Sequence, residues 1–162
     1  SEPTPQVMQS PGRASATTIG TDLLRMRDEE KLARDVYAKL ADTSGLPMFR
    51  NIVGAEQRHM QSLERLIQTA GDGEVAWSNI PGEFDFPEHQ RLYKSLIASG
   101  TRSPLDALMA GAKIEEMDIA DLQRLLAQTT DRQIRSVLEN LMRASHNHLR
   151  AFAARIFLSE PR

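Results

Sequence analysis

The chain has 162 residues, of which 40% are hydrophobic and 26% charged, enough to bury a core in one ordinary globular domain. Its 20 Lys and Arg residues against 22 Asp and Glu give a formal charge of −2, which argues against a nucleic-acid-binding protein that depends on a strong positive field. The absence of cysteine excludes disulfides, thiolate ligands and thiol nucleophiles and leaves a periplasmic, secreted or cytoplasmic location open. No apolar run approaches the roughly 18–20 residues of a membrane span.

The first segment in chain order is rich in Ser, Thr and Pro and lacks apolar periodicity. We interpret residues 1–20 as a flexible N-terminal arm or linker, and residues 21–162 as one helical domain. Apolar residues at helical spacing then predict helices over about 21–42 and 48–69, each of which ends in a glycine-containing turn.

The segment 71–87 has a different character, because aromatic residues stand among prolines and glycines. We expect a long irregular crossover in which Trp77, Phe84 and Phe86 form a buried hydrophobic lid over the helices. A short helix is predicted at about 88–98, at the end of this connection.

Two further long helices complete the prediction. Ser103 ahead of a proline is a start signal for a helix that runs to about residue 128, and Thr130 or Asp131 caps a last helix that runs to about residue 158. Four long helices with two short connections and one long one predict an all-α bundle in which the second and third long helices run in the same direction. An irregular all-α domain is the alternative.

The sharpest chemical signal is a Glu-x-x-His pair, Glu56 and His59, in the second helix. Residues three apart lie on the same side of a helix, here beside Leu63 and Leu66. An isolated pair of this kind is more often part of a solvated face. On a buried face, however, a carboxylate costs several kcal/mol unless it is paired or binds a metal.

The other long helices also carry an inward polar residue near their middle. Glu30 lies on the apolar stripe of the first helix, Glu115 lies near the centre of the stripe of the third, and His148 lies on the inner face of the fourth. Asp118 follows Glu115 by one turn toward the edge of its stripe. A single inward acid would be explained by a salt bridge in the core, but agreement among four helices favours a site for iron, manganese or zinc.

Several stretches resemble the ferritin-like superfamily, which includes rubrerythrin and ferritin and whose bundles also contain one long crossover. EKLARDVY (residues 30–37) resembles its first-helix pattern, and AEQRHM (residues 55–60) resembles its second-helix Glu-x-x-His. Three stretches, MRDEEKLARDVY, GAKIEEMDIADL and RASHNHLRAF, are together most similar to a bacterial and archaeal branch known as a domain of unknown function. The resemblance covers about residues 21–158. It implies a ferritin-like four-helix bundle with a diiron carboxylate centre and oxidoreductase or iron-handling activity.

The sequence departs from the family pattern in the last helix. His148 matches the family histidine, but Ser145 stands where a second Glu-x-x-His would have its carboxylate. One ligand is therefore missing unless Asp118, Glu29 or water replaces it, and the second ion of a dinuclear site would be held weakly.

We accordingly expect one or two iron ions, or manganese or zinc, to be held by five residues, with Asp118 as a possible addition: Glu30, Glu56, His59, Glu115 and His148. The alternative is a non-catalytic scaffold or a module for a single metal ion. No partner other than metal ions is predicted, although a homo-oligomer is compatible with the sequence.

The remaining polar residues are expected to lie away from this site. We interpret His89 as an exposed helix residue and expect His146 to face away from His148. Asp28 and Lys31 are predicted to point away from the apolar stripe of the first helix, whereas Glu29 is predicted to flank this stripe.

Overall fold

The computed structural model describes the backbone of residues 12–70 and 75–161, which forms helices and contains no strand in these ranges. The all-helical class predicted from the sequence is confirmed. The helices are α1 (Gly12–Ser44), α2 (Pro47–Ala70), α3 (Pro87–Gly100), α4 (Pro104–Gln128) and α5 (Arg132–Ser159). Among them, none combines the length and apolar character needed to cross a membrane.

The start of α1 corrects the sequence prediction. Residues 12–20, which the sequence predicts to be part of the arm, are helical, whereas residues 1–11 lie outside the described part of the chain. No proline occurs between residues 12 and 46. An established helix extends at little cost, because each added residue gains a hydrogen bond without a new nucleation step.

The other helix ends follow local signals in the sequence. Ser103 Oγ accepts a hydrogen bond from the Asp106 N–H at 3.0 Å, directly before the proline that opens α4, and Asp131 Oδ1 accepts one from the Ile134 N–H at 3.0 Å. Each cap satisfies a donor that the first turn of the helix leaves free. Gly45 has a φ of 69° between α1 and α2, a left-handed conformation that glycine adopts without steric cost.

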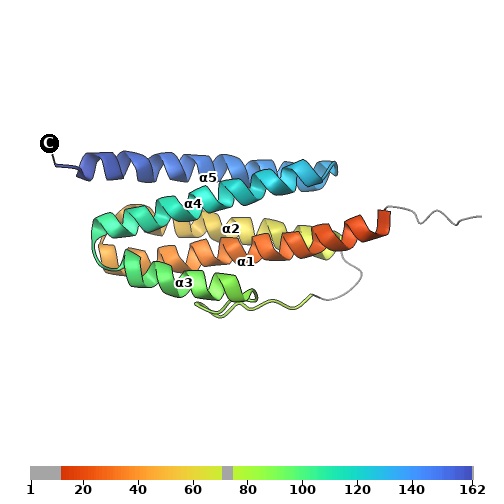
Figure 1. Cartoon of the computed structure of the whole chain (residues 1–162), viewed down its shortest axis with the longest axis horizontal. Helices are drawn as coiled ribbons and strands as arrows, with labels where there is room; N and C mark the ends of the chain where they lie inside the picture. The colour runs from red at the N-terminus through yellow and green to blue at the C-terminus, as the bar shows by residue number, and fades with distance from the viewer. Residues whose placement is uncertain (1–11, 71–74, 162) are drawn as a thin grey trace, which may run out of the picture.

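The four long helices lie side by side, as Figure 1 shows. α1 and α5 run in one direction, and α2 and α4 run in the other (Figure 1). The chain between α2 and α4 therefore returns along the length of the molecule, and α3 at its end packs on the outside against α1 and α4.

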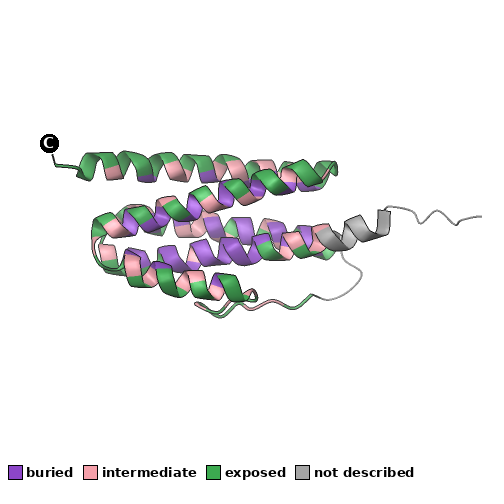
Figure 2. Cartoon of the chain, viewed as in Figure 1, coloured by how far each residue is buried: buried purple, intermediate pink, exposed green. Residues whose placement is uncertain are grey.

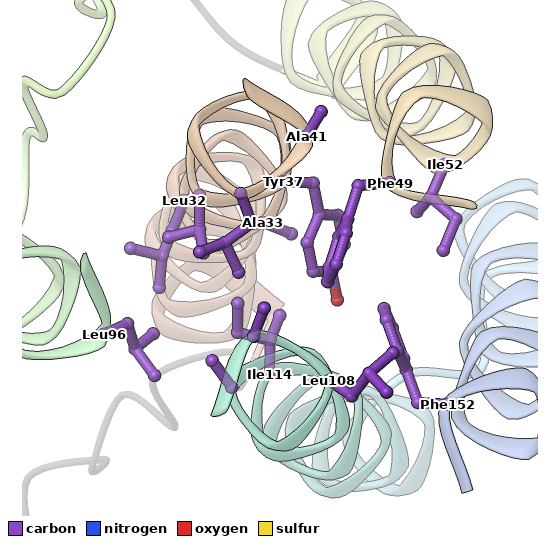
Figure 3. Packing of buried hydrophobic residues seen from close by; sticks show 14 residues of the cluster. Leu32, Ala33, Tyr37, Ala41, Phe49, Ile52, Leu96, Leu108, Ile114 and Phe152 are labelled. Carbon is purple, nitrogen blue, oxygen red and sulfur yellow. The ribbon is translucent and has the colours of Figure 1, made fainter. Parts of the chain in front are cut away.

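Two hydrophobic clusters form the core. The first contains the rings of Tyr37, Phe49 and Phe152, whose centroids are 5.6 to 5.8 Å apart and which gather between the helices in Figure 3. The second contains residues from the other half of each long helix, including Leu23, Leu63, Leu122 and Leu138. Buried residues consequently follow the helices over much of their length (Figure 2).

The crossover covers a side of α1 that the sequence prediction left exposed. Lys31 Nζ donates to the carbonyl oxygens of Ile80 and Glu83 at 2.6 and 2.7 Å, and Asp28 accepts from two crossover amides. Asp28 and Lys31 point away from the stripe that faces the other long helices, but both are fully buried, because the crossover covers them. The periodicity of α1 shows which face meets the other long helices but not that a distant segment covers its other side.

The aromatic residues of the crossover, Trp77, Phe84 and Phe86, are half-buried, although the sequence predicts a buried lid. Trp77 packs against the second cluster and Phe84 against the first. Cations of α1 lie over these rings: Arg27 over Trp77 at 5.2 Å and Lys31 over Phe84 at 4.5 Å from the ring centroid. The lid is thus held by polar and cation–π contacts as well as by apolar burial.

Candidate metal centre

A layer of ionisable side chains separates the two hydrophobic clusters. On α2, for example, Phe49 and Ile52 belong to the first cluster and Leu63 to the second, and Glu56 and His59 lie between them. On each of the other long helices, ionisable residues likewise lie between residues of the first cluster and residues of the second. The layer contains seven ionisable residues that are buried or, for His148, half-buried: Glu29, Glu30, Glu56, His59, Glu115, Asp118 and His148.

Three of these residues form the first group of candidate ligands. His59 Nδ1 lies 3.2 Å from Glu30 Oε2 and 3.0 Å from Glu56 Oε2. The ligand atoms of Glu30, Glu56 and His59 all lie within 4.8 Å of one another. α1 and α2 together supply this triad, and the Glu-x-x-His spacing places both α2 residues on the same side of the helix.

A second group repeats the arrangement with α4 and α5. His148 Nδ1 lies 3.1 Å from Glu115 Oε1 and 3.2 Å from Glu56 Oε1. The ligand atoms of Glu56, Glu115 and His148 also lie within 4.8 Å of one another. Glu56 thus belongs to both triads, with Oε2 toward His59 and Oε1 toward His148. The two imidazole rings stack at 6.4 Å between centroids.

Tyr37 connects the second triad to the first hydrophobic cluster. Its hydroxyl lies 2.9 Å from Glu115 Oε1, to which it donates a hydrogen bond, and 3.3 Å from the Gly111 carbonyl oxygen. A hydrogen bond from a fixed ring orients the carboxylate before any ligand arrives. Space for this packing depends on Gly111, because a Cβ there would lie 2.5 Å from the Phe152 ring.

The carboxylates and imidazoles shift one another's protonation. Although burial lowers the pKa of His59, its hydrogen bonds with Glu30 and Glu56 outweigh this effect and raise the pKa to about 10. Burial likewise lowers the pKa of His148, but Glu115 and Glu56 raise it to about 9. Without metal, the two histidines are therefore imidazolium ions at neutral pH and supply the positive charge of the layer.

The carboxyl groups differ from one another. Burial and the neighbouring Glu56 carboxylate raise the pKa of Glu30 well above its usual range. Burial also raises the pKa of Glu115, against the opposing effect of the His148 hydrogen bond. For Glu56, hydrogen bonds from Glu30, His148 and His59 outweigh burial and hold the pKa well below its usual range. Glu56 is therefore the carboxylate that stays ionised.

The layer contains more hydrogen-bond acceptors than donors. Buried acceptors without a donor show whether the layer suits metal ions, because a cation can take the place of the absent donors. Glu30 Oε1, Glu115 Oε2 and both carboxylate oxygens of Asp118 are buried without a hydrogen-bond partner among the described residues. An unpartnered buried carboxylate costs several kcal/mol. Divalent cations with oxygen and nitrogen ligands would remove this cost, and the donor set suits iron, manganese or zinc.

Ser145 lies on α5, one turn before His148, and is buried, with 2% of its surface exposed. Asp118, predicted as an additional ligand, lies outside both triads among the described residues. It contacts Glu29, with which it is within hydrogen-bonding distance.

His89 requires a correction, because it is buried, with 5% of its surface exposed, and not on the molecular surface. Its Nδ1 lies 2.7 Å from Asp28 Oδ2. A signal was present in the sequence, since His89 precedes Leu92 and Leu96 by three and seven residues and so shares their face of α3. His146 is exposed, as predicted.

These features define an all-helical protein with a buried cluster of carboxylates and histidines at its centre. Residues 20–159 match the uncharacterized protein domain DUF2202, and the chain belongs to this family. It is similar to the uncharacterized protein MJ0754 of Methanocaldococcus jannaschii, with 43% identity over 130 residues that span 80% of this chain and 70% of that protein.

A solved structure is also similar. The crystal structure of the hypothetical protein MJ0754 from Methanococcus jannaschii has a TM-score of 0.81 and 37% sequence identity to this chain, and the match covers 96% of this chain and 85% of that one. The predicted likeness to a domain of unknown function with archaeal members is confirmed by these matches.

Proposed function

We propose that this protein is a ferritin-like bundle that binds two divalent metal ions, iron in the first place, with Glu56 as the carboxylate between them. The observation that carries the proposal is the position of Glu56, whose two oxygens face different histidines at 3.0 and 3.2 Å. One ion would take Glu30 and His59 in addition, and the other would take Glu115 and His148. The order of helix directions and the single long crossover support the ferritin-like assignment.

Charge supports two ions over none. The carboxylates of Glu30, Glu56 and Glu115 are almost completely removed from water, so three buried negative charges require compensation. In the metal-free protein, protons on the carboxyls and histidines provide it. Metal ions would displace these protons, and their binding should therefore release protons and strengthen as the pH rises.

The protein's own contribution would be to hold and shield the ions. When bound, a pair of iron ions would supply the electrons for reaction with oxygen or peroxide. Glu30 and Glu115 would each bind one of the ions, and Tyr37 would fix the orientation of Glu115 through its hydrogen bond of 2.9 Å. The hydrophobic clusters on either side would keep water out of the layer.

A non-catalytic module for a single ion is the second candidate, and Ser145 favours it. In the full ferritin-like pattern a carboxylate at this position helps to neutralise two cations, but this chain has a buried hydroxyl there. The second ion would then be weakly held, and Ser145→Glu should strengthen its binding. If that variant still binds only one ion at the Glu56 site, the single-ion module is correct.

The proposal is tested by anaerobic loading with Fe²⁺, desalting and elemental analysis of the wild type and of single histidine variants. His59→Ala and His148→Ala should each lower the bound iron by about one ion per chain, because each removes a ligand from a different triad. His146→Ala is the matched control, since His146 is exposed on the same helix as His148. Equal iron contents in all three variants would refute the proposal, provided that circular dichroism shows each to be folded.

A further inference from the structure

A second group of buried acids lies beside the candidate centre, on the side of α1 that faces α4 and α3. Glu29 and Asp118 are exposed over 1% and 0% of their surfaces, and their carboxyl groups are within hydrogen-bonding distance of each other. Neither Glu29 Oε1 nor either oxygen of Asp118 has a hydrogen-bond donor among the described residues. Two buried carboxyl groups in contact require a shared proton or a cation.

His89, whose ring nitrogen could bind a metal ion, lies beside this pair. Asp28 accepts hydrogen bonds from the Asp85 and Phe86 amides and from His89 Nδ1. Because a carboxylate oxygen accepts hydrogen bonds, Nδ1 of His89 is the nitrogen that donates to Asp28, and Nε2 is the ring nitrogen left to face another ligand. A carboxylate behind the ring is the usual support of a metal-binding histidine.

The flanking nitrogen faces Glu29. His89 Nε2 lies 3.9 Å from Glu29 Oε2, which is too long for a hydrogen bond. It is within the separation of two ligands on one ion, since bonds of about 2.1 Å allow at most about 4.2 Å between ligand atoms.

One member of the pair, Glu29, borders a cavity. Glu29 lines a cavity of about 270 Å³ between α1 and α4, together with Asp22, Asp121 and Gln128. The two arginines of the cavity are engaged with acids, Arg25 with Glu88 and Arg124 with Asp121. The residues that line this cavity include neither Glu56 nor the other members of the two triads.

From these contacts we infer an auxiliary divalent-cation site formed by the carboxylates of Glu29 and Asp118 and flanked by His89. Water from the cavity would complete the coordination of the ion. A site dominated by carboxylate and water ligands suits Mn²⁺ or Fe²⁺. Glu29, Asp118 and His89 belong to neither of the two triads.

The test locates Mn²⁺ in crystals of the wild type by its anomalous scattering. A peak between Glu29 and Asp118 is expected, in addition to any peak at Glu56. Its absence, with Mn²⁺ present at the Glu56 triads, would overturn the auxiliary site and leave the proposed function standing.

Equilibrium dialysis with Mn²⁺ gives the matching result in solution. Glu29→Gln and Asp118→Asn keep side-chain size and should each weaken one binding event by about tenfold or more. Glu116→Gln, an exposed residue on the same helix as Asp118, is the control and should bind as the wild type does. The same two variants made in Glu56→Gln protein should still lose that event, which separates this site from the Glu56 centre. Unchanged Mn²⁺ binding in both variants means that the pair holds a shared proton, and the inference fails.

Discussion

The stability of the metal-free protein should fall as the pH rises from about 6 to 10, which is the reverse of what a carboxylate-rich core suggests at first sight. The cause is the pair of raised histidine pKa values, about 10 for His59 and about 9 for His148. A group whose pKa is raised on folding contributes stability that is complete below its unfolded pKa, near 6.5, and is lost as the pH rises through the folded value.

The magnitude follows from the size of these shifts. For His148, a rise from 6.5 to about 9 corresponds to about 3 kcal/mol, at about 1.4 kcal/mol per pKa unit. The contributions of the two histidines do not add in full, because both contact Glu56 and interacting groups titrate together. The raised pKa values of Glu30 and Glu115 act in the same direction, since these groups hold protons in the folded state that they lose as the pH rises.

Urea unfolding in the presence of a chelator, followed by circular dichroism between pH 6 and 10, measures this dependence. The midpoint should fall steadily in the wild type, and the fall should be smaller in His148→Gln. Addition of Mn²⁺ should reverse the slope up to about pH 8, because metal ligands must be deprotonated. A metal-free midpoint that does not change with pH, or one that falls equally in the wild type and in His148→Gln, would refute the proposed charge state of the layer.

Three further substitutions test the packing around the layer. Tyr37→Phe removes the hydroxyl that lies 2.9 Å from Glu115 and should weaken metal binding about tenfold without changing the number of bound ions. A competition titration measures this affinity. An unchanged affinity would mean that Tyr37 contributes only to packing of the core. Gly111→Ala places a Cβ 2.5 Å from the Phe152 ring and should cost about 1–3 kcal/mol of unfolding free energy, whereas no loss in urea melts would mean that the ring moves aside freely. Asp28→Ala leaves the crossover amides without their acceptor and should cost about 1–3 kcal/mol; hydrogen exchange of those amides should accelerate, and unchanged protection would contradict the anchoring role.

The parts of the structure that were predictable from the sequence depend on local signals. The cap at Ser103 and the cap at Asp131 mark helix starts directly, because a side-chain oxygen three residues before an amide is a local arrangement. The convergence of Glu30, Glu56 and Glu115 also followed from periodicity, since each lies near the middle of an apolar stripe and the helices have similar lengths.

The features that were missed depend on contacts between distant segments. Asp28 and Lys31 are buried because residues 78–86 cover them, and no pattern within α1 encodes that cover. α1 contacts the other long helices on one side and the crossover with α3 on the other. An interpretation that gives α1 a single buried face therefore does not predict the burial of the polar residues on its second side. His89 differs, because its spacing to Leu92 and Leu96 indicates the buried face of α3, and only its partner Asp28 is remote in the sequence.

The central claim, two metal ions joined by Glu56, is tested most directly by electron paramagnetic resonance of the protein loaded with Mn²⁺. Two ions that share the Glu56 carboxylate are magnetically coupled, so the wild type should give the spectrum of a coupled pair, and Glu56→Gln should lose it while retaining signals of isolated ions. Spectra of isolated ions alone in both proteins would contradict the account.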